Sequence, residues 1–174
     1  ILEQIGVMPE IERAGFVTKH GATLVWGADP EPWSWYFADD PGQRPTSFQV
    51  VRSEFDDILL KNAGKHGVEV IEEAQVLDVV FENERATGAV YLHEGSEKEM
   101  SARFVVDASG QAALLSRKLG LLEWDTHFNN LAVYGYFKNA RHLDSPNDGN
   151  IFIEAFEHGW LWKIPLHIGM DSVG

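Results

Sequence analysis

A lysine near the amino terminus is the first residue whose surroundings indicate chemistry. Lys19 lies between Phe16-Val17 and the β-prone residues 22–26. A lysine held among apolar strand residues is poorly hydrated, which lowers the pKa of its amine and makes the neutral, nucleophilic form accessible. A lone lysine also commonly stays in water, where it has no such role, and the local sequence leaves both readings open.

The second candidate is an aromatic segment near the carboxyl end, residues 159–165. If it forms a strand, Trp160, Trp162 and Ile164 share one face, whereas Lys163 lies on the other. Two large rings one pleat apart form an apolar wall that excludes water and can shield a reactive intermediate. Ordinary core packing is the alternative interpretation of the same pattern.

The third candidate is the run V-V-D-A-S-G at 105–110, which precedes a predicted helix over 112–119. A helix start offers free backbone N–H groups and the positive end of the helix dipole, both suited to phosphate. In the alternative interpretation, Asp107 and Ser109 cap the helix and Gly110 makes the turn.

Arg52 is the fourth candidate. It directly precedes a helix that is expected to begin with Ser53 as N-cap, with Asp56 completing an acidic capping box. A cation at a helix start gains nothing from the dipole, which favours a ligand or a carboxylate as the partner of Arg52. A surface ion pair explains it equally well.

The elements that must position these residues follow from hydrophobic periodicity and turn chemistry. A hairpin turn is expected at 82–85, and a long irregular loop at 27–45. The pattern predicts a mixed α/β fold in which one α/β layer supports a sheet-rich layer, with ligands bound where the layers meet. The predicted strands cover 22–26, 48–51, 68–71, 76–81, 86–92, 103–106, 131–137, 150–156 and 159–166, and the predicted helices cover 53–63 and 112–119.

Composition excludes several classes of function. The 174 residues carry a formal charge of −13, which disfavours binding to nucleic acid and to anionic membranes. There is no cysteine, so disulfides and thiolate catalysis are excluded. The sequence has no apolar run of about 20 residues, no signal peptide and no metal-ligand spacing among its histidines, and we expect a cytoplasmic protein. It begins with Ile1 and ends as a strand would if cut short, so we expect both ends of the natural protein to be missing.

Together these segments resemble the flavin-dependent halogenases, which belong to the fold group of the aromatic-hydroxylase FAD enzymes. The resemblance favours the types that act on phenolic or carrier-bound substrates in secondary metabolism, including antibiotic biosynthesis. The matching segments, in the family's order, are F-V-x-K-x-x-A-T at 16–23, W-G and P-W-S at 26–34, Q-V-x-R-x-E-F-D at 49–56, the FAD-contacting segment at 104–110 and W-x-W-x-I-P at 160–165.

The resemblance implies a reaction in which reduced FAD and O2 convert chloride or bromide into hypohalous acid. Lys19 would hydrogen-bond that species or carry it as a haloamine to an electron-rich aromatic substrate. A flavin reductase or NADH would supply the electrons. The resemblance assigns FAD contacts to Arg52, Val76, Asp107, Ser109 and Gly110, and the tunnel lining to Trp160, Trp162, Ile164 and Pro165.

The resemblance also implies a partial FAD-binding α/β domain, residues 1–15 and 48–122, and a mostly antiparallel substrate domain, residues 16–47 and 123–174. The family's G-x-G-x-x-G strand–turn–helix and its later Gly-Asp segment are absent from this chain. We therefore expect the chain alone to bind FAD poorly and to be inactive. Two alternatives remain: a monooxygenase or reductase of the same fold group without halide chemistry, and a non-catalytic binding module.

Overall fold

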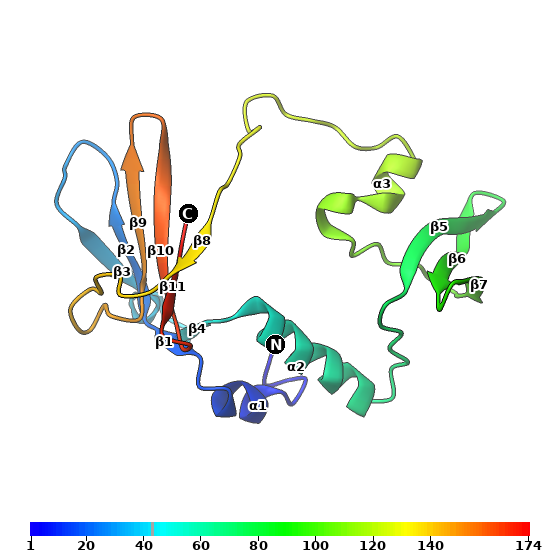
Figure 1. Cartoon of the computed structure of the whole chain (residues 1–174), viewed down its shortest axis with the longest axis horizontal. Helices are drawn as coiled ribbons and strands as arrows, with labels where there is room; N and C mark the ends of the chain where they lie inside the picture. Colours follow the sequence, from blue (N-terminus) through cyan, green and yellow to red (C-terminus); the bar gives the residue numbers. More distant parts are fainter. Residues whose placement is uncertain (43) are drawn as a thin grey trace. The chain divides into compact units, whose positions relative to one another are not determined.

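The computed structural model describes residues 1–42 and 44–174 and divides into two compact units. The first unit comprises Ile1–Val68 and Leu131–Gly174, and the second comprises Glu69–Asn130 (Figure 1). Each unit has its own sheet, and strands and helices occur in both, which confirms the mixed α/β class. The assignment of residues to FAD and substrate domains concerns function and stays a prediction.

The first unit is built on a six-stranded sheet in the order β3-β2-β9-β10-β11-β8 (Figure 1). Only the β2–β9 pair is parallel, and the other four pairs are antiparallel. The strands are β2 (Gly21–Val25), β3 (Trp33–Tyr36), β8 (Gly135–Phe137), β9 (Ile151–Phe156), β10 (Gly159–Leu166) and β11 (Met170–Val173).

Two helices and a small two-stranded sheet complete this unit. The short strands β1 (Val17–Lys19) and β4 (Ser47–Gln49) pair with each other, and α1 (Met8–Arg13) and α2 (Arg52–Lys65) lie beside one another (Figure 1). Apolar residues of these elements and of the segments that adjoin them form a buried cluster, because each amphipathic element needs a partner for its apolar side. The core consists of Val7, Ile11 and Phe16, with Leu2, Ala14, Phe48, Val50, Phe55, Ile58 and Leu59 packed against it.

A polar contact ties α2 to the sheet. His167, in the turn after β10, packs edge-on against Phe16 at 5.0 Å between ring centroids. Its Nε2 lies 3.1 Å from an Oε2 of Glu54 in the first turn of α2. The start of α2 is therefore held against the carboxyl end of β10.

The second unit consists of a three-stranded antiparallel sheet followed by a short helix. Asn83 and Glu84 both have positive φ, 48° and 67°, as a two-residue hairpin turn requires. The hairpin predicted at this position is confirmed. The elements are β5 (Gln75–Glu82), β6 (Arg85–His93), β7 (Ser96–Ser101), a 3-10 turn η2 (Gly110–Ala112) and α3 (Leu114–Lys118).

Two predicted strands, 68–71 and 103–106, are wrong. The strand that returns along β6 is the polar segment β7, whose side chains are all exposed and whose backbone completes the ladder. Residues 103–106 pair with no strand among the residues the structure describes, and Phe104 and Val106 are 84% and 85% exposed. An apolar run forms a strand only where another strand supplies hydrogen bonds, and here the sequence does not reveal that partner.

Two further boundaries differ from the predictions. The predicted loop 27–45 contains β3 and the 3-10 turn η1 (Phe37–Asp39), and its residue 43 lies outside the described residues. Only Gly135–Phe137 of the predicted strand 131–137 is extended and paired. In the described part of the chain, no helix is both long enough and apolar enough to cross a bilayer.

Candidate functional site

One face of the six-stranded sheet collects tryptophan side chains from distant parts of the sequence. Trp162 of β10 lies opposite Ile153 of β9. Leu24 of β2 lies between Ile153 and Trp33 of β3. Directly paired residues project to the same side of a sheet, so Trp33 and Trp162 share a face although they are 129 positions apart in the sequence.

The same face holds two more tryptophans. Trp35 lies opposite Ala22, one pleat along from the Trp33 row. Trp160 and Trp162 contact each other with ring centroids 5.5 Å apart and planes inclined at 46°. The predicted aromatic strand is therefore confirmed as a structure, and we call the surface formed by Trp33, Trp35, Trp160 and Trp162 the tryptophan face.

The tryptophan face is accessible to solvent. Trp33, Trp35 and Trp160 are 49%, 43% and 50% exposed. Ile164 lies on this face as predicted, opposite Ser172, whereas the buried Pro165 lies opposite Asp171 on the other side of the sheet. Exposed flat rings offer a surface on which a planar ligand can stack.

Lys19 lies at the end of β1, directly before β2. Its Nζ is 5.8 Å from the centroid of the Phe37 ring. The Phe37 ring in turn packs edge-on against Trp35, 5.2 Å between centroids. Lys19 is half-buried, and burial lowers the pKa of its amine. Phe37 thus links the lysine to the Trp35 end of the tryptophan face.

The link from β1 to β2 is fixed by an asparagine that the sequence analysis missed. Asn150 is 1% exposed, and its Oδ1 accepts hydrogen bonds from the backbone N–H of His20 at 3.0 Å and of Gly21 at 2.8 Å. Its Nδ2 donates to Oδ1 of Asn147 at 2.9 Å. The only sequence signal is a polar residue placed directly before the apolar strand β9. Asn150 therefore holds the backbone next to Lys19.

Close backbone contact explains the glycine beside this asparagine. A Cβ on Gly149 would lie 1.9 Å from the carbonyl oxygen of Thr18. Gln49 is buried, and its Nε2 donates to the carbonyl of Gly149 at 3.4 Å. The chain before Lys19 is thus packed against the segment before β9 at a distance that only glycine permits.

The other side of the sheet carries a polar cluster above a cavity of about 570 Å³. Lys163 donates from Nζ to the backbone oxygen of Arg141 at 2.6 Å. Burial lowers the pKa of Lys163, and the negative charge of Asp171 raises it by a smaller amount. Nε2 of His142 lies 3.6 Å from Oδ2 of the buried Asp171. The cavity is lined by Pro32, Arg141, His142, Leu143, Asp144, Phe152, Leu161, Lys163 and Val173.

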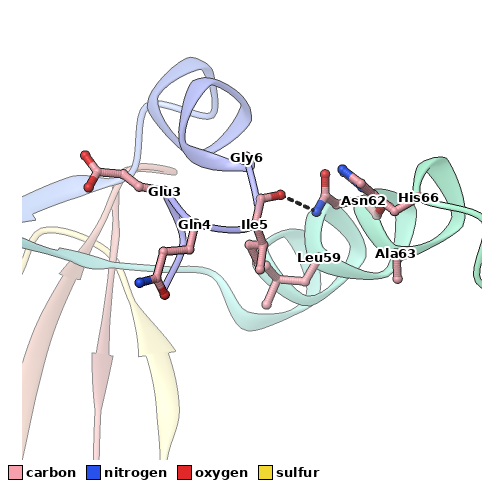
Figure 2. Close-up of a pocket in the computed structure, with 8 residues that line it drawn as sticks. All are labelled: Glu3, Gln4, Ile5, Gly6, Leu59, Asn62, Ala63 and His66. Atoms are coloured by element: carbon pink, nitrogen blue, oxygen red, sulfur yellow. Dashed lines mark hydrogen bonds between the residues drawn. The ribbon is translucent and has the colours of Figure 1, made fainter.

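A second cavity, of about 550 Å³, lies between the amino-terminal segment and α2 (Figure 2). Two of its lining residues are hydrogen-bonded to each other: Nδ2 of Asn62 donates to the carbonyl oxygen of Ile5 at 3.1 Å. None of the predicted site residues belongs to it. Its lining is Glu3, Gln4, Ile5, Gly6, Leu59, Asn62, Ala63 and His66.

In the second unit, the predicted phosphate-binding helix start is occupied by the protein's own side chains. Oδ2 of Asp107 accepts from the N–H of Leu115 at 2.8 Å, and Oγ of Ser109 accepts from the N–H of Leu114 at 3.1 Å. Of the two interpretations left open by the sequence, these hydrogen bonds show the capping one, in which Asp107 and Ser109 occupy the N–H groups of Leu115 and Leu114. The hydrogen bonds lower the pKa of Asp107, most strongly those with Ser109, and Gly110 has the positive φ of 62° expected of a turn.

The remaining predicted cofactor residues lie on exposed surfaces. Arg52 is the first residue of α2, whose N-cap is Val51, so the predicted Ser53 cap and capping box are wrong. Its Nε and Nη2 donate to the carboxylate of Asp56 at 3.1 and 3.0 Å, and this contact raises the pKa of Arg52. Val76 lies on β5, 46% exposed.

Known proteins are similar to this chain over nearly its whole length. A tryptophan 2-halogenase of Chondromyces crocatus is 33% identical over 177 residues, covering 100% of this chain and 33% of that protein. A 1H-pyrrole-2-carbonyl-[peptidyl-carrier protein] chlorinase of Pseudomonas fluorescens is 34% identical and covers 100% of this chain and 44% of that protein. The structure of the myxobacterial chondrochloren halogenase superposes with a TM-score of 0.90 at 43% identity, over 99% of this chain and 40% of that one.

The chain thus spans between a third and less than half of the length of these relatives. The model of one protein family, described as tryptophan halogenase, matches residues 38–174. That match includes the segments with Arg52, Asp107 and the W-x-W-x-I-P strand. The resemblance inferred from the sequence is confirmed: this chain belongs to the tryptophan halogenase family.

Proposed function

We propose that the protein containing this chain is an FAD-dependent halogenase that acts on an electron-rich aromatic substrate. Reduced FAD, together with O2 and chloride or bromide, supplies hypohalous acid when bound. Lys19 is the catalytic residue that passes the halogen on, and the tryptophan face separates the organic substrate from the flavin. A monooxygenase without halide chemistry and a non-catalytic module are the alternatives that the experiment below must exclude.

The single observation that carries this proposal is the position of Lys19 at the edge of the tryptophan face. Its ammonium is half-buried over Phe37, whose ring contacts Trp35. Three strand spacings separate β3 from β10, which places Trp35 about 14 Å from the strand of Trp162. An accessible aromatic surface with an amine at its margin suits the binding of a flat cofactor, and a small reactive species could then lie between the cofactor and the amine.

The lowered pKa of Lys19 supports its role. Burial makes the neutral amine available at lower pH than in an exposed lysine. The neutral amine can attack hypohalous acid: an N–halogen bond forms, the halogen–oxygen bond breaks, and the displaced hydroxide takes the amine proton to leave as water. In its charged form, the same group donates a hydrogen bond to the acid.

Further parts of the proposal concern partners and the cofactor. A flavin reductase or NADH would reduce the flavin, and the substrate would be a small aromatic compound, free or bound to a carrier protein, as the names of the two relatives indicate for them. We place the protein in the cytoplasm. The residues proposed to contact FAD remain Arg52, Val76, Asp107, Ser109 and Gly110, and those proposed to line the tunnel remain Trp160, Trp162, Ile164 and Pro165.

The experiment supplies the full-length protein with FAD, a flavin reductase, NADH, O2 and a panel of phenols and pyrroles, with bromide, chloride or neither. Mass spectrometry of the products should show halide-dependent halogenation. Hydroxylated product that is independent of halide would instead establish a monooxygenase. A purified full-length protein without flavin affinity would favour the binding module.

If Arg52 binds the cofactor, its replacement should weaken the binding of FAD without lowering the stability of the protein. Arg52→Ala breaks an exposed ion pair, which contributes little to stability, so the melting temperature of the full-length protein should not change. If the guanidinium binds the cofactor, the Kd for FAD should rise by about tenfold or more, as expected for the loss of a charged hydrogen bond. Fluorescence quenching of FAD measures the Kd.

A matched control exists on the same helix. Asp57→Ala breaks the i,i+4 ion pair with Lys61 on α2 and should change neither the Kd nor the melting temperature. Equal Kd values for Arg52→Ala and Asp57→Ala would remove Arg52 from the cofactor site and leave it as a partner of Asp56.

A further inference from the structure

Phe37 occupies a position that its sequence context did not reveal. It begins the 3-10 turn η1, directly after β3, and its backbone N–H donates to the carbonyl oxygen of His20 at 2.9 Å. His20 is the residue after Lys19. The backbone of Phe37 is thus anchored next to the lysine, independently of what its side chain does.

The ring of Phe37 contacts both the lysine and the tryptophan face. One contact is with Nζ of Lys19, 5.8 Å from the centroid, and the other is with Trp35, at 5.2 Å and an interplanar angle of 81°. A cation within about 6 Å of a ring face is attracted to it. Because Trp35 packs edge-on against the same ring, the ring cannot turn away from the lysine without losing that contact.

We infer that Phe37 is the positioning residue of Lys19: its ring, held by Trp35, covers the amine from water and keeps it directed toward the tryptophan face. This inference rests on the proposed function for its catalytic meaning, but the contact itself is independent of halide chemistry. Phe37 touches neither the substrate nor the halogen in this role, and it acts only through the lysine.

The charges around Lys19 leave burial as the cause of its altered titration. The titratable side chains on adjoining segments are His20 beside it, Tyr36 and Asp39 around η1, and Asp148 before β9. Within the described part of the chain, burial is the cause of the lowered pKa of Lys19, and none of these side chains contributes to it. A change in the apolar cover should therefore appear directly in the titration of the amine.

The test measures the pKa of Lys19 in the full-length protein and in variants of Phe37. Lysines are dimethylated with 13C-formaldehyde, the signal of Lys19 is assigned by its loss in Lys19→Arg, and its chemical shift is followed against pH. Phe37→Ala should move the titration of Lys19 upward, toward that of an exposed lysine, because water reaches the amine and the burial that lowers its pKa outweighs the attraction of the ring for the charged form. Phe37→Leu, a milder change, should give a smaller upward shift, and Phe37→Tyr should restore the wild-type curve.

Phe156→Ala is the matched control, because Phe156 lies on β9 opposite Gly159, exposed and without contact to Lys19. It should leave the titration unchanged. If Phe37→Leu and Phe37→Ala also titrate as the wild type does, the inference is overturned. If Phe37→Ala does not fold, the Leu and Tyr variants decide the question.

The same variants separate this inference from the proposed function. On the unmethylated enzyme, Phe37→Ala should lower the turnover number for halogenated product about tenfold or more, with an unchanged rate of flavin oxidation. A shifted titration in a protein that forms no halogenated product would uphold the contact of Phe37 with Lys19 and reject the halogenase. A normal titration with full halogenation would reject only the role of Phe37.

Discussion

Replacing Lys19 by alanine is expected to lower the yield of halogenated product at least about 100-fold in the full-length enzyme, the usual loss for a positioned proton-transfer or nucleophilic group. NADH-driven oxidation of the flavin should continue at the wild-type rate. The amine lies in β1 and makes no ion pair within the described residues, so its removal should leave the fold intact. Product formation and NADH consumption are measured in the same reaction.

The two measurements together decide the role of Lys19. Loss of flavin oxidation along with halogenation would mean that the substitution damages the cofactor site, and retention of both would mean that the amine is not needed. Lys138→Ala, which changes an exposed lysine of the same unit, is the control and should preserve both activities. Since the pKa of Lys19 is lowered by burial, a route through the neutral amine should also remain active at lower pH than an exposed lysine allows.

Local patterns in the sequence were sufficient where an element carries its own signal. The alternation at 159–166 places the tryptophans of β10 on one face, and the apolar runs flanking 82–85 fix the hairpin. The turn could be predicted because the conformation of Asn83 and Glu84 depends only on the residues directly beside them. Family membership could also be predicted from such segments, because their order along the chain can be read without knowing the fold.

Predictions failed where a residue depends on a distant partner. Trp35 was expected in an irregular loop, yet it joins the tryptophan face because β2 supplies a ladder for β3. Residues 103–106 look like a buried strand, but their hydrogen-bonding partner cannot be read from their own sequence. Asp107 was left between two interpretations, and its carboxylate accepts from the backbone of Leu115 eight positions later, as the capping interpretation expects. The surroundings of Lys19 could likewise not be predicted, since Phe37 approaches it through pairing of separate segments.

Asn150→Ala should destabilise the protein more than any other single polar truncation near Lys19. It leaves the N–H groups of His20 and Gly21 without their acceptor in a site where Asn150 itself is 1% exposed. Each buried unsatisfied donor costs about 1–3 kcal/mol, so the free energy of unfolding should fall by about 2–5 kcal/mol. Denaturant titration of the full-length protein, followed by tryptophan fluorescence, measures the change.

Asn147→Ala separates the two halves of this hydrogen-bond network. It removes the acceptor for Nδ2 of Asn150 and for the hydroxyl of Tyr36, but it leaves both backbone N–H groups bonded to Asn150. Because Asn147 is only partly buried, water can replace it, and we expect a loss of less than half that of Asn150→Ala. An equal loss of unfolding free energy in the two variants would show that the Asn147–Asn150 hydrogen bond stabilises this region. The hydrogen bonds from Asn150 to the backbone of His20 and Gly21 would then contribute little.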